Sequence, residues 1–524
     1  MSHSKLAVAI LGGGMAGSLL ARQLVRQLPG HRIGVFEKKR EHSYTVGESM
    51  VEIASNYFVR RLGLSSYLYE RHYPKNGLRF FFDSGDKTTP LQEMSEIGSA
   101  SLPFHPAFQI DRSRLESDLN QMNVRDGVRV RMGVRVDRLE LGRDGAPHRF
   151  RVLDGSKSEE FESRWVIDAT GRNRMIARLE NLQVPETQLE NAATWGWFEG
   201  VTDIDSLGPE SFRERVRHTP RRLSTLHFLY RGYWIWFIPL QGGTTSIGVV
   251  GEKSRLARKF GSGEELLAFL RQHAAVGSLL ESAKPIATRN FAHLAYGTRR
   301  FFSPDRWGLV GESGAFPDPY YSPGADFIAL ANDLVGDLIA RDLRGEEPAA
   351  VRDRTELYDQ FMHFRVEAAM RLYRDLYPVI GSYELCKLRW DLDIGCYYNL
   401  WVSQFTRDEH LDARELKRQL VQRDYILAAL SNFTALFQKL DAHLSAKGAY
   451  YRKNRGEYSD GQDCLGFARR VGCPRSPTDV IETTQEIFNA VRNRALDLLE
   501  DAPTPVEREA KPLVWFTSPR ELDA

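Results

Sequence analysis

The stretch Leu6-Ala-Val-Ala-Ile-Leu-Gly-Gly-Gly-Met-Ala-Gly17 decides the fold of this chain. Residues 6–11 are apolar without interruption, as is typical of a strand buried on both faces of a parallel sheet. Residues 18–28 place leucines on one helical face, and Pro29-Gly30 ends this helix. Residues 32–37 then predict a second strand, which ends on an acid. Strand, helix and strand make a βαβ unit, so we expect an α/β domain to begin here.

The glycines of this stretch have the spacing of a dinucleotide-binding turn. Gly12, Gly14 and Gly17 lie between the strand and the helix, and Glu37 follows twenty residues after Gly17. The first glycine makes the turn, the second lets the backbone approach a pyrophosphate, and the third lets the helix pack closely on the strand. The helix N-terminus offers free N–H groups to the phosphates, and Glu37 can accept hydrogen bonds from ribose hydroxyls. These four residues are therefore predicted to bind a dinucleotide.

The composition of the 524 residues is that of an ordinary globular protein, with 42% hydrophobic and 27% charged residues. Lys and Arg number 71 and Asp and Glu 69, so the formal charge of +2 gives no electrostatic reason to expect nucleic acid or a membrane as a partner. No apolar run approaches the roughly 18 residues that a membrane span needs. The four cysteines form no C-x-x-C pair, which favours reduced, buried thiols in a cytoplasmic protein.

Strands are expected in the middle of the chain and helices towards its end. Residues 128–141 and 149–153 predict a hairpin, and residues 164–168 predict another buried strand. Aromatic and β-branched residues between 195 and 250 predict an antiparallel sheet. Helical spacing is expected in residues 327–343 and in most of 349–499, and the proline-rich residues 501–524 are expected to wrap the surface.

Two later stretches resemble the signatures of FAD proteins of the hydroxybenzoate-hydroxylase superfamily. Asp168-Ala-Thr-Gly-Arg172 ends the strand at 164–168, and Trp307-Gly-Leu-Val-Gly-Glu-Ser-Gly314 is a strand that runs into a glycine turn. In that superfamily the A-T-G turn lies near the flavin, and an acid of the last motif, usually Asp, meets the ribityl chain. The resemblance implies FAD as the cofactor. It adds Asp168, Gly171, Gly311 and Glu312 to the predicted binding residues. Glu312 is a longer acid than the usual Asp and has the same hydrogen-bonding role.

The predicted fold class is α/β, in three parts. A Rossmann-like FAD-binding domain is expected from residues 1–190 together with 285–345. An inserted antiparallel sheet at 191–284 is expected to form the substrate region, and a mostly helical region follows at 346–524.

Three further segments resemble the flavin-dependent halogenases, and this resemblance spans roughly residues 6–330. Trp234, Trp236 and Ile238 fit W-x-W-x-I, and Phe316-Pro-Asp-Pro-Tyr-Tyr-Ser-Pro-Gly324 fits F-x-x-P-x-x-S-x-G. Pro74-Lys-Asn-Gly-Leu-Arg-Phe80 follows the segment Val46-Gly-Glu-Ser49 and places Lys75 before an aromatic strand. The resemblance implies an FADH2-dependent oxidoreductase of secondary metabolism, such as antibiotic biosynthesis, that installs chlorine or bromine on an electron-rich aromatic.

The same resemblance assigns roles to particular residues. Reduced flavin and O2 give a C4a-hydroperoxide, which chloride or bromide attacks to form hypohalous acid. Lys75 is implied to direct this species, through a hydrogen bond or as a haloamine, because an amine buried among aromatics has a lowered pKa. Trp234 and Trp236 are implied to wall the site, and Glu48 to lie beside the flavin. On their own, two tryptophans on one strand face are also compatible with core packing, and a single lysine with a surface position.

The chain departs from the family pattern at two positions. Tryptophan halogenases carry Glu before the motif serine, where this chain has Tyr321; a phenol-like or other non-tryptophan aromatic is therefore expected, with Tyr321 in the site wall. In the family, backbone N–H groups at the end of the motif can hold the halide, and Pro323 has no N–H to donate. The predicted halide-binding residues are accordingly Ser322, Gly324 and Ala325.

Partners and alternatives follow from the same features. Only one dinucleotide motif is present, so a separate NAD(P)H-dependent flavin reductase is expected to supply the reduced flavin. The small aromatic substrate is expected to be either free or bound to a carrier protein. His72, His105 and His227 lack ligand spacing, so they are expected to be structural, and no metal is expected. One alternative is a flavin monooxygenase or oxidase that does not use halide, since fold does not fix function. Another is a non-catalytic flavin-binding protein that docks partners on its helical region.

Overall fold

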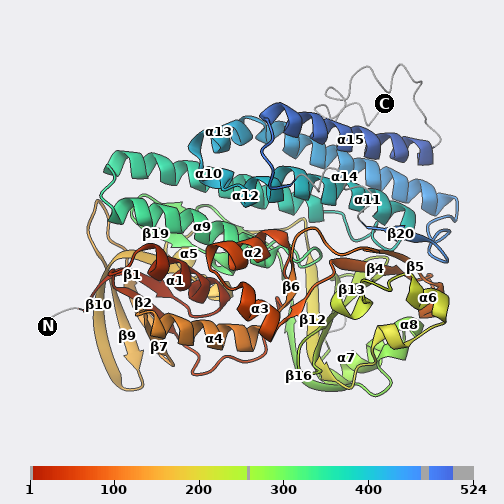
Figure 1. Ribbon diagram of the computed structural model, residues 1–524, viewed down its shortest axis with the longest axis horizontal. Helices are drawn as coiled ribbons and strands as arrows, with labels where there is room; N and C mark the ends of the chain where they lie inside the picture. Colours follow the sequence, from red (N-terminus) through yellow and green to blue (C-terminus); the bar gives the residue numbers. More distant parts are fainter. Residues whose placement is uncertain (1–3, 257–259, 462–470, 500–524) are drawn as a thin grey trace.

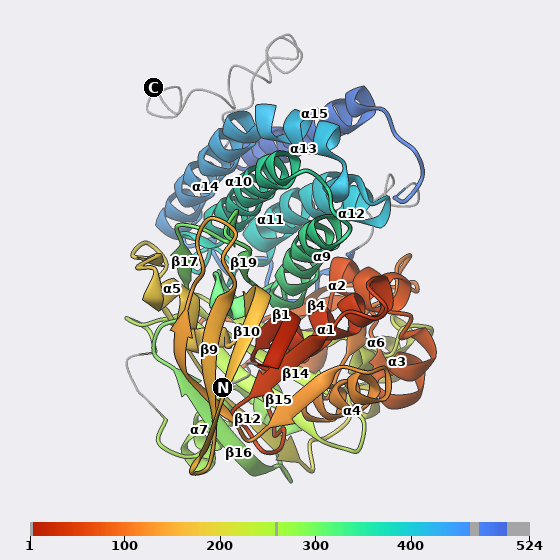
Figure 2. The same cartoon turned by 90° about the vertical axis from the view of Figure 1, so that its left-hand side faces the viewer.

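The computed structural model describes residues 4–256, 260–461 and 471–499, so the expectation for residues 501–524 lies outside the described residues. In Figure 1 a first lobe, which contains the N-terminus, and a second lobe lie side by side beneath a layer of helices. Figure 2, turned by 90°, shows the same helical layer on top of the two lobes. No helix within these ranges combines the length and the hydropathy that crossing a membrane requires.

The first lobe is built on a sheet whose central strands are parallel. β1 (Ser4–Leu11) lies between β2 (Ile33–Glu37) and β10 (Lys157–Asp168), with β7 (Arg129–Met132) beyond β2 and β19 (Trp307–Leu309) beyond β10. β18 (Phe302–Ser303), β8 (Arg135–Glu140) and β9 (His148–Asp154) join it as antiparallel strands. α1 (Met15–Gln27) contacts α4 (Arg112–Arg125) and α9 (Gly324–Leu343). The βαβ unit predicted from residues 6–37 is confirmed.

The second lobe is an eight-stranded sheet that draws on distant parts of the chain. Its order is β16 (Lys284–Phe291), β12 (Asn191–Glu199), β15 (Thr245–Glu252), β14 (Tyr233–Pro239), β13 (Thr225–Tyr230), β4 (Leu78–Phe82), β5 (Ser95–Gly98) and β20 (Tyr458–Asp460). β12 to β16 pair in antiparallel fashion, as expected, but β4 lies parallel to β13 and β20 parallel to β5. The sheet is therefore mixed, and it includes strands from outside residues 191–284. α6 (Glu210–Glu214), α7 (Gly263–Leu270) and α8 (Ala274–Leu279) belong to this lobe.

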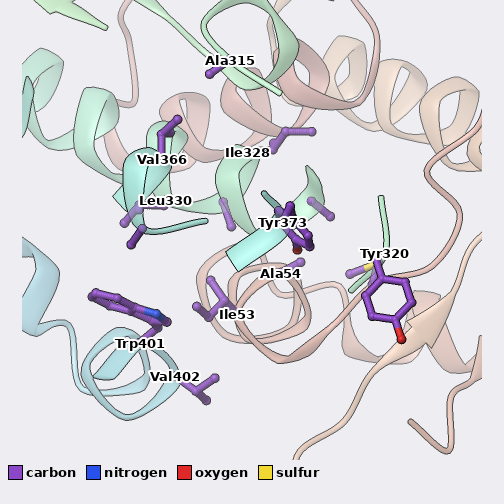
Figure 3. Packing of buried hydrophobic residues seen from close by; sticks show 14 of the residues in the cluster. Ile53, Ala54, Ala315, Tyr320, Ile328, Leu330, Val366, Tyr373, Trp401 and Val402 are labelled. Atoms are coloured by element: carbon purple, nitrogen blue, oxygen red, sulfur yellow. The ribbon is translucent and has the colours of Figure 1, made fainter. Parts of the chain in front are cut away.

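The helical layer contains six α-helices and one π-helical segment. These are α10 (Pro348–Tyr373), α11 (Tyr383–Cys396), the π-helical η7 (Tyr397–Val402), α12 (Ser403–Thr406), α13 (Ala413–Val421), α14 (Arg423–Ala446) and α15 (Pro477–Leu499). A single hydrophobic cluster joins this layer to α9 and to α2 (Glu52–Asn56). Figure 3 shows its members Ile53 and Ala54 from α2, Ile328 and Leu330 from α9, Val366 and Tyr373 from α10, and Trp401 and Val402 from η7.

The predicted α/β class, with a second sheet and a helical C-terminal region, is confirmed, and three details differ from expectation. Residues 129–132 form β7 beside β2 instead of belonging to the hairpin, which is made by β8 and β9. The helix expected at 327–343 begins at Gly324. Cys386 and Cys396 are buried, but Cys473 is exposed, and Cys464 lies outside the described residues. The predicted domain boundaries remain a prediction.

Candidate active site

The predicted dinucleotide turn lies at the edge of the first sheet, between β1 and α1. Gly12 has a φ of +108°, and a Cβ atom there would lie 2.3 Å from the carbonyl oxygen of Ala169. A Cβ atom on Gly17 would lie 2.0 Å from the carbonyl oxygen of Gly12, so only glycine lets α1 pack this closely on the turn. Gly12 and Gly14 line a cavity of about 830 Å³, which we call the first cavity.

The other predicted cofactor residues surround this turn. The Glu37 carboxylate accepts hydrogen bonds from the backbone N–H groups of Gly13 (2.7 Å) and Lys39 (2.8 Å), and it lines the first cavity. Gly171 and Glu312 also line it, and the Gly171 N–H donates to the Ser313 hydroxyl at 3.0 Å, which joins the two later turns.

Three of the predicted cofactor residues lie behind the cavity wall: Gly17, Asp168 and Gly311. Asp168 accepts from the N–H and hydroxyl of Thr170 and from the N–H of Ile176. Burial raises its pKa, since desolvation disfavours the charged form. Asp168 therefore shapes the A-T-G turn from beneath. Gly311, with a φ of +59°, packs against Ile328 and Ala16.

The residues that line the first cavity fit FAD in their chemistry. It runs from the N-terminus of α1, where N–H groups have no intrahelical acceptor, past Glu37 and Glu312 to the tryptophans of the second sheet. Trp195 lines this cavity, and its indole N–H is buried without a hydrogen-bond partner among the described residues.

Glu48 lies buried in the wall of the first cavity, where the resemblance expects it to be near the flavin. It accepts from the indole N–H of Trp197 at 2.7 Å, and burial raises its pKa to about 7. Tyr44 stacks on Trp197 with ring centroids 5.2 Å apart. The glutamate is thus held by Trp197, whose ring Tyr44 in turn supports.

Lys75 lies in the wall of a second cavity, and hydrogen bonds connect it to the first. Lys75 is 2% exposed, and its Nζ donates to the Ser49 hydroxyl (2.7 Å) and the Met50 carbonyl (2.8 Å). The Ser49 hydroxyl in turn contacts those of Thr225 and Ser322, both at 2.8 Å. Ser49, Thr225 and Ser322 line the first cavity. Burial lowers the pKa of Lys75 to about 7, although the negative charges of Glu52 and Asp326 act to raise it.

The second cavity, of about 130 Å³, lies where α2, α9, the helical layer and the segment 99–107 meet. Aromatic and aliphatic side chains dominate its lining, among them Phe104, Tyr373, Trp390 and Trp401. The polar members of the lining are Glu52, Lys75, Ser99, Asp326, Arg365 and Asp393, together with four tyrosines. Such an apolar cavity with a few convergent polar groups is typical of a small-molecule site.

The three predicted wall residues are divided between the two cavities. Trp234 and Trp236 line the first cavity, where their indole N–H groups donate to the Tyr377 hydroxyl (3.1 Å) and the Ser246 hydroxyl (3.3 Å). Tyr321 lines the second cavity and donates to Asp393 at 2.9 Å. The tryptophans therefore bound the dinucleotide side, and Tyr321 bounds the Lys75 side.

The predicted halide-binding residues lie together at the start of α9. Ser322, with a left-handed φ of 59°, Gly324 and Ala325 all line the first cavity. Gly324 and Ala325 occupy the first turn of a 20-residue helix, where N–H groups and the helix dipole favour an anion. Pro323, between Ser322 and Gly324, lines the second cavity instead.

Several site residues carried no signal of their own in the sequence. Thr225, His227 and Trp195 line the first cavity from the second sheet. His227 was expected to be structural; it packs between Phe80 and Trp234 and burial lowers its pKa to about 3. Ser49 belongs to the quoted G-E-S segment, which is the signal that could have identified it.

One group of three metal-ligand side chains occurs among the described residues: Asp333, Asp408 and His410. Arg61 donates to both aspartates, at 2.9 Å and 2.6 Å. An arginine at the centre of the group makes this an ion-pair network that joins η1 (Tyr57–Arg61), α9 and the helical layer.

Comparison with known proteins agrees with this geometry. A family model described as an FAD binding domain matches residues 5–237. The flavin-dependent halogenase chlA of Dictyostelium discoideum is 26% identical over 450 residues, which cover 77% of this chain and 71% of that protein. The 1H-pyrrole-2-carbonyl peptidyl-carrier protein chlorinase of Pseudomonas fluorescens is 27% identical over 386 residues, which cover 70% and 80%. The solved structure of halogenase PltM in complex with phloroglucinol and FAD superposes with a TM-score of 0.67 at 16% identity, covering 96% of this chain and 98% of that one.

The fold, the glycine turn and the first cavity together define an FAD-dependent oxidoreductase. Within that class the chain is related to the flavin-dependent halogenases over most of its length.

Proposed function

We propose that this protein is an FADH2-dependent halogenase of an electron-rich aromatic of the phenol or pyrrole kind. The observation that carries the proposal is the position of Lys75. Its buried amine lines an apolar cavity, and a chain of hydroxyl groups links it to the cavity that fits FAD. The relatives whose names specify halogenation, including that of a pyrrole, support the same reaction.

The residues of the first cavity would hold the cofactor and the halide. Gly12, Gly14 and Glu37 would bind the dinucleotide, and Glu48 with Trp197 would lie beside the flavin. Bound reduced FAD supplies the reaction with O2 and chloride or bromide that yields hypohalous acid. The N–H groups of Gly324 and Ala325, at the start of α9, would hold the halide. A separate NAD(P)H-dependent flavin reductase delivers the reduced flavin.

Lys75 passes the halogen from one cavity to the other. Two N–H groups of the amine are donated to Ser49 and Met50, so the neutral amine keeps its lone pair for the halogen. The nitrogen forms an N–X bond as the X–O bond of hypohalous acid breaks, and the released hydroxide leaves as water with the amine proton. The aromatic carbon then takes X+ from nitrogen, and the ring proton returns to the amine. The walls of the second cavity exclude water, which would otherwise compete for the halogen.

Product analysis tests this proposal. The enzyme, FAD, a flavin reductase, NADH and O2 are incubated with phenols, pyrroles and indoles, each with chloride, bromide or no halide. We expect halide-dependent mass shifts with the matching isotope pattern. Lys75→Met keeps an apolar chain of similar length without a buried charge, and we expect it to lower the halogenated product by a factor of about 100 or more while FAD content is kept.

The pH dependence gives a second readout on the same lysine. Because burial lowers the pKa of Lys75 to about 7, the nucleophilic neutral amine increases as the pH rises through that value. The ratio of halogenated product to released H2O2 should therefore rise from pH 6 to pH 8. Exposed Lys417 on α13 provides the control Lys417→Met, which should behave as the wild type. A halide-independent gain of oxygen or loss of hydrogen in the product would instead identify a monooxygenase or an oxidase.

A further inference from the structure

The second cavity contains a buried arginine that forms no ion pair with any described residue. Arg365, on α10, is 9% exposed and lines the cavity. It makes no hydrogen bond and no ion pair with any described residue, and its guanidinium lies over the rings of Trp401, 3.9 Å from Cζ to the centroid, and Phe361. Its nitrogens are not sealed in by protein atoms, so they remain accessible to a ligand. Trp401 is labelled in Figure 3.

The carboxylates of the cavity are already engaged elsewhere. Asp326 accepts from the Ala54 N–H and the Tyr397 hydroxyl, both at 2.8 Å, and burial raises its pKa to about 7. Asp393 pairs with Arg389 at 2.7 Å. Glu52 accepts from the Tyr398 hydroxyl at 2.7 Å. None of the three lies within ion-pair distance of Arg365.

An isolated buried cation is costly unless something pairs with it. Burial accordingly lowers the pKa of Arg365 to about 10, but at neutral pH the guanidinium still carries its charge. Trp401 covers one face of the planar group, so the N–H donors at its edge remain available. Those donors match the two oxygens of a carboxylate in a bidentate pair.

We propose that the second cavity takes an aromatic acid, and that Arg365 binds its carboxylate while the ring lies towards Lys75. Lys75 and Arg365 line the same cavity of about 130 Å³, so a single small aromatic bound there can contact both side chains. This inference rests on the proposed function and narrows its substrate class: the substrate is a free acid, since a carrier thioester has no such carboxylate. Arg365 is thereby a substrate-binding residue that sets which end of the ring system faces the lysine.

Calorimetric titration of the FAD-loaded enzyme tests the carboxylate subsite without turnover. The probes are 3,5-dihydroxybenzoate and pyrrole-2-carboxylate, each compared with its methyl ester, which keeps the ring and removes the charge. In the wild type we expect each acid to bind about tenfold or more tightly than its ester, the effect of a charged hydrogen bond. In Arg365→Met the ratio should fall to near one, and in Arg365→Lys, which keeps the charge but loses the fork, it should be intermediate.

Arg371→Met is the matched control on the same helix, because Arg371 points to Glu367 and the carbonyl of Leu427 rather than the cavity. It should keep the full acid preference. FAD content and circular dichroism verify that the variants fold. The ratio of acid to ester affinity in the wild type tests the inference even if Arg365→Met does not fold. Equal affinity of acid and ester in the wild type, no binding of either acid, or an acid preference that survives in Arg365→Met overturns the inference. A product that does not depend on halide would refute the halogenase proposal alone and leave the acid preference intact.

Discussion

Pro323 and Gly324 are neighbours in the chain but line different cavities. Pro323 belongs to the wall of the second cavity, and Gly324 to that of the first. The N–H group that proline lacks therefore belongs to a residue on the Lys75 side, whereas the helix N–H groups of Gly324 and Ala325 begin on the flavin side. The departure from the family motif at Pro323 is compatible with halide binding for this reason.

Restoring the missing N–H should consequently have little effect on halide use. For Pro323→Ala we expect the halide concentration at half-maximal product formation to change by less than about twofold, below the contribution of one hydrogen bond. Ser322→Ala is the comparison, since its hydroxyl lines the first cavity and donates to Ser49, and we expect a larger increase there. Chloride and bromide titrations measure both. A clear tightening in Pro323→Ala would show that the proline does limit halide binding.

At the scale of elements, the contact between α1 and the glycine turn is the tightest requirement on the sequence. A methyl group on Gly17 would meet the Gly12 carbonyl oxygen at 2.0 Å, a backbone atom that cannot rotate away. We expect Gly17→Ala to lower the free energy of unfolding by about 1–3 kcal/mol and to reduce the FAD content of the purified protein. Urea unfolding and flavin absorbance measure the two effects.

Gly297→Ala provides the control for this change. Gly297, in β17 (Tyr296–Thr298), would bring its Cβ atom no closer than 3.9 Å to Val184 in the paired strand β11 (Gln183–Pro185). This variant should retain both FAD and stability. If Gly17→Ala also retained both, close packing at the turn would not be what requires glycine at position 17.

The two cavities differ in how far the sequence could predict them. The first depends on contiguous motifs, because a strand, a turn and a helix N-terminus place Gly12, Gly14 and Glu37 together by local geometry alone. The second is assembled from α2, α9, α10, α11, η7 and the segment 99–107, so no local pattern marks it. In particular, no sequence pattern distinguishes Arg365 from other arginines in helices. The parallel pairing of β4 with β13 was likewise unpredictable, since it joins residues about 150 positions apart and depends on the packing of the whole lobe.

At the scale of the whole molecule, one buried carboxyl group connects the three parts of the fold. Asp318 lies in the segment between β19 and α9. It accepts from Asn191 at the start of β12 (2.9 Å) and from Tyr377, just after α10 (2.9 Å). The Tyr377 hydroxyl also accepts from Trp234 of β14 at 3.1 Å. Asp318 is fully buried, and the desolvation raises its pKa to about 6.

This shift predicts how the stability of the molecule depends on pH. The folded-state pKa of about 6 lies above the ordinary value of 3.8, so the native state binds the Asp318 proton more tightly than the unfolded state. The stabilisation is fully present below pH 3.8 and is lost as the pH rises through about 6, a change of about 3 kcal/mol.

Asp318→Asn cannot titrate. Relative to the wild type, its free energy of unfolding should therefore increase by about 2 kcal/mol between pH 4 and pH 8, whatever constant offset the altered hydrogen bonds add. Urea unfolding across this range measures the difference, with Asp424→Asn, whose side chain is 99% exposed, as the control that should show no such trend. A difference between Asp318→Asn and the wild type that stays constant with pH would mean that Asp318 is ionised in the folded protein, and its junction would then be held by a charged rather than a protonated carboxyl group.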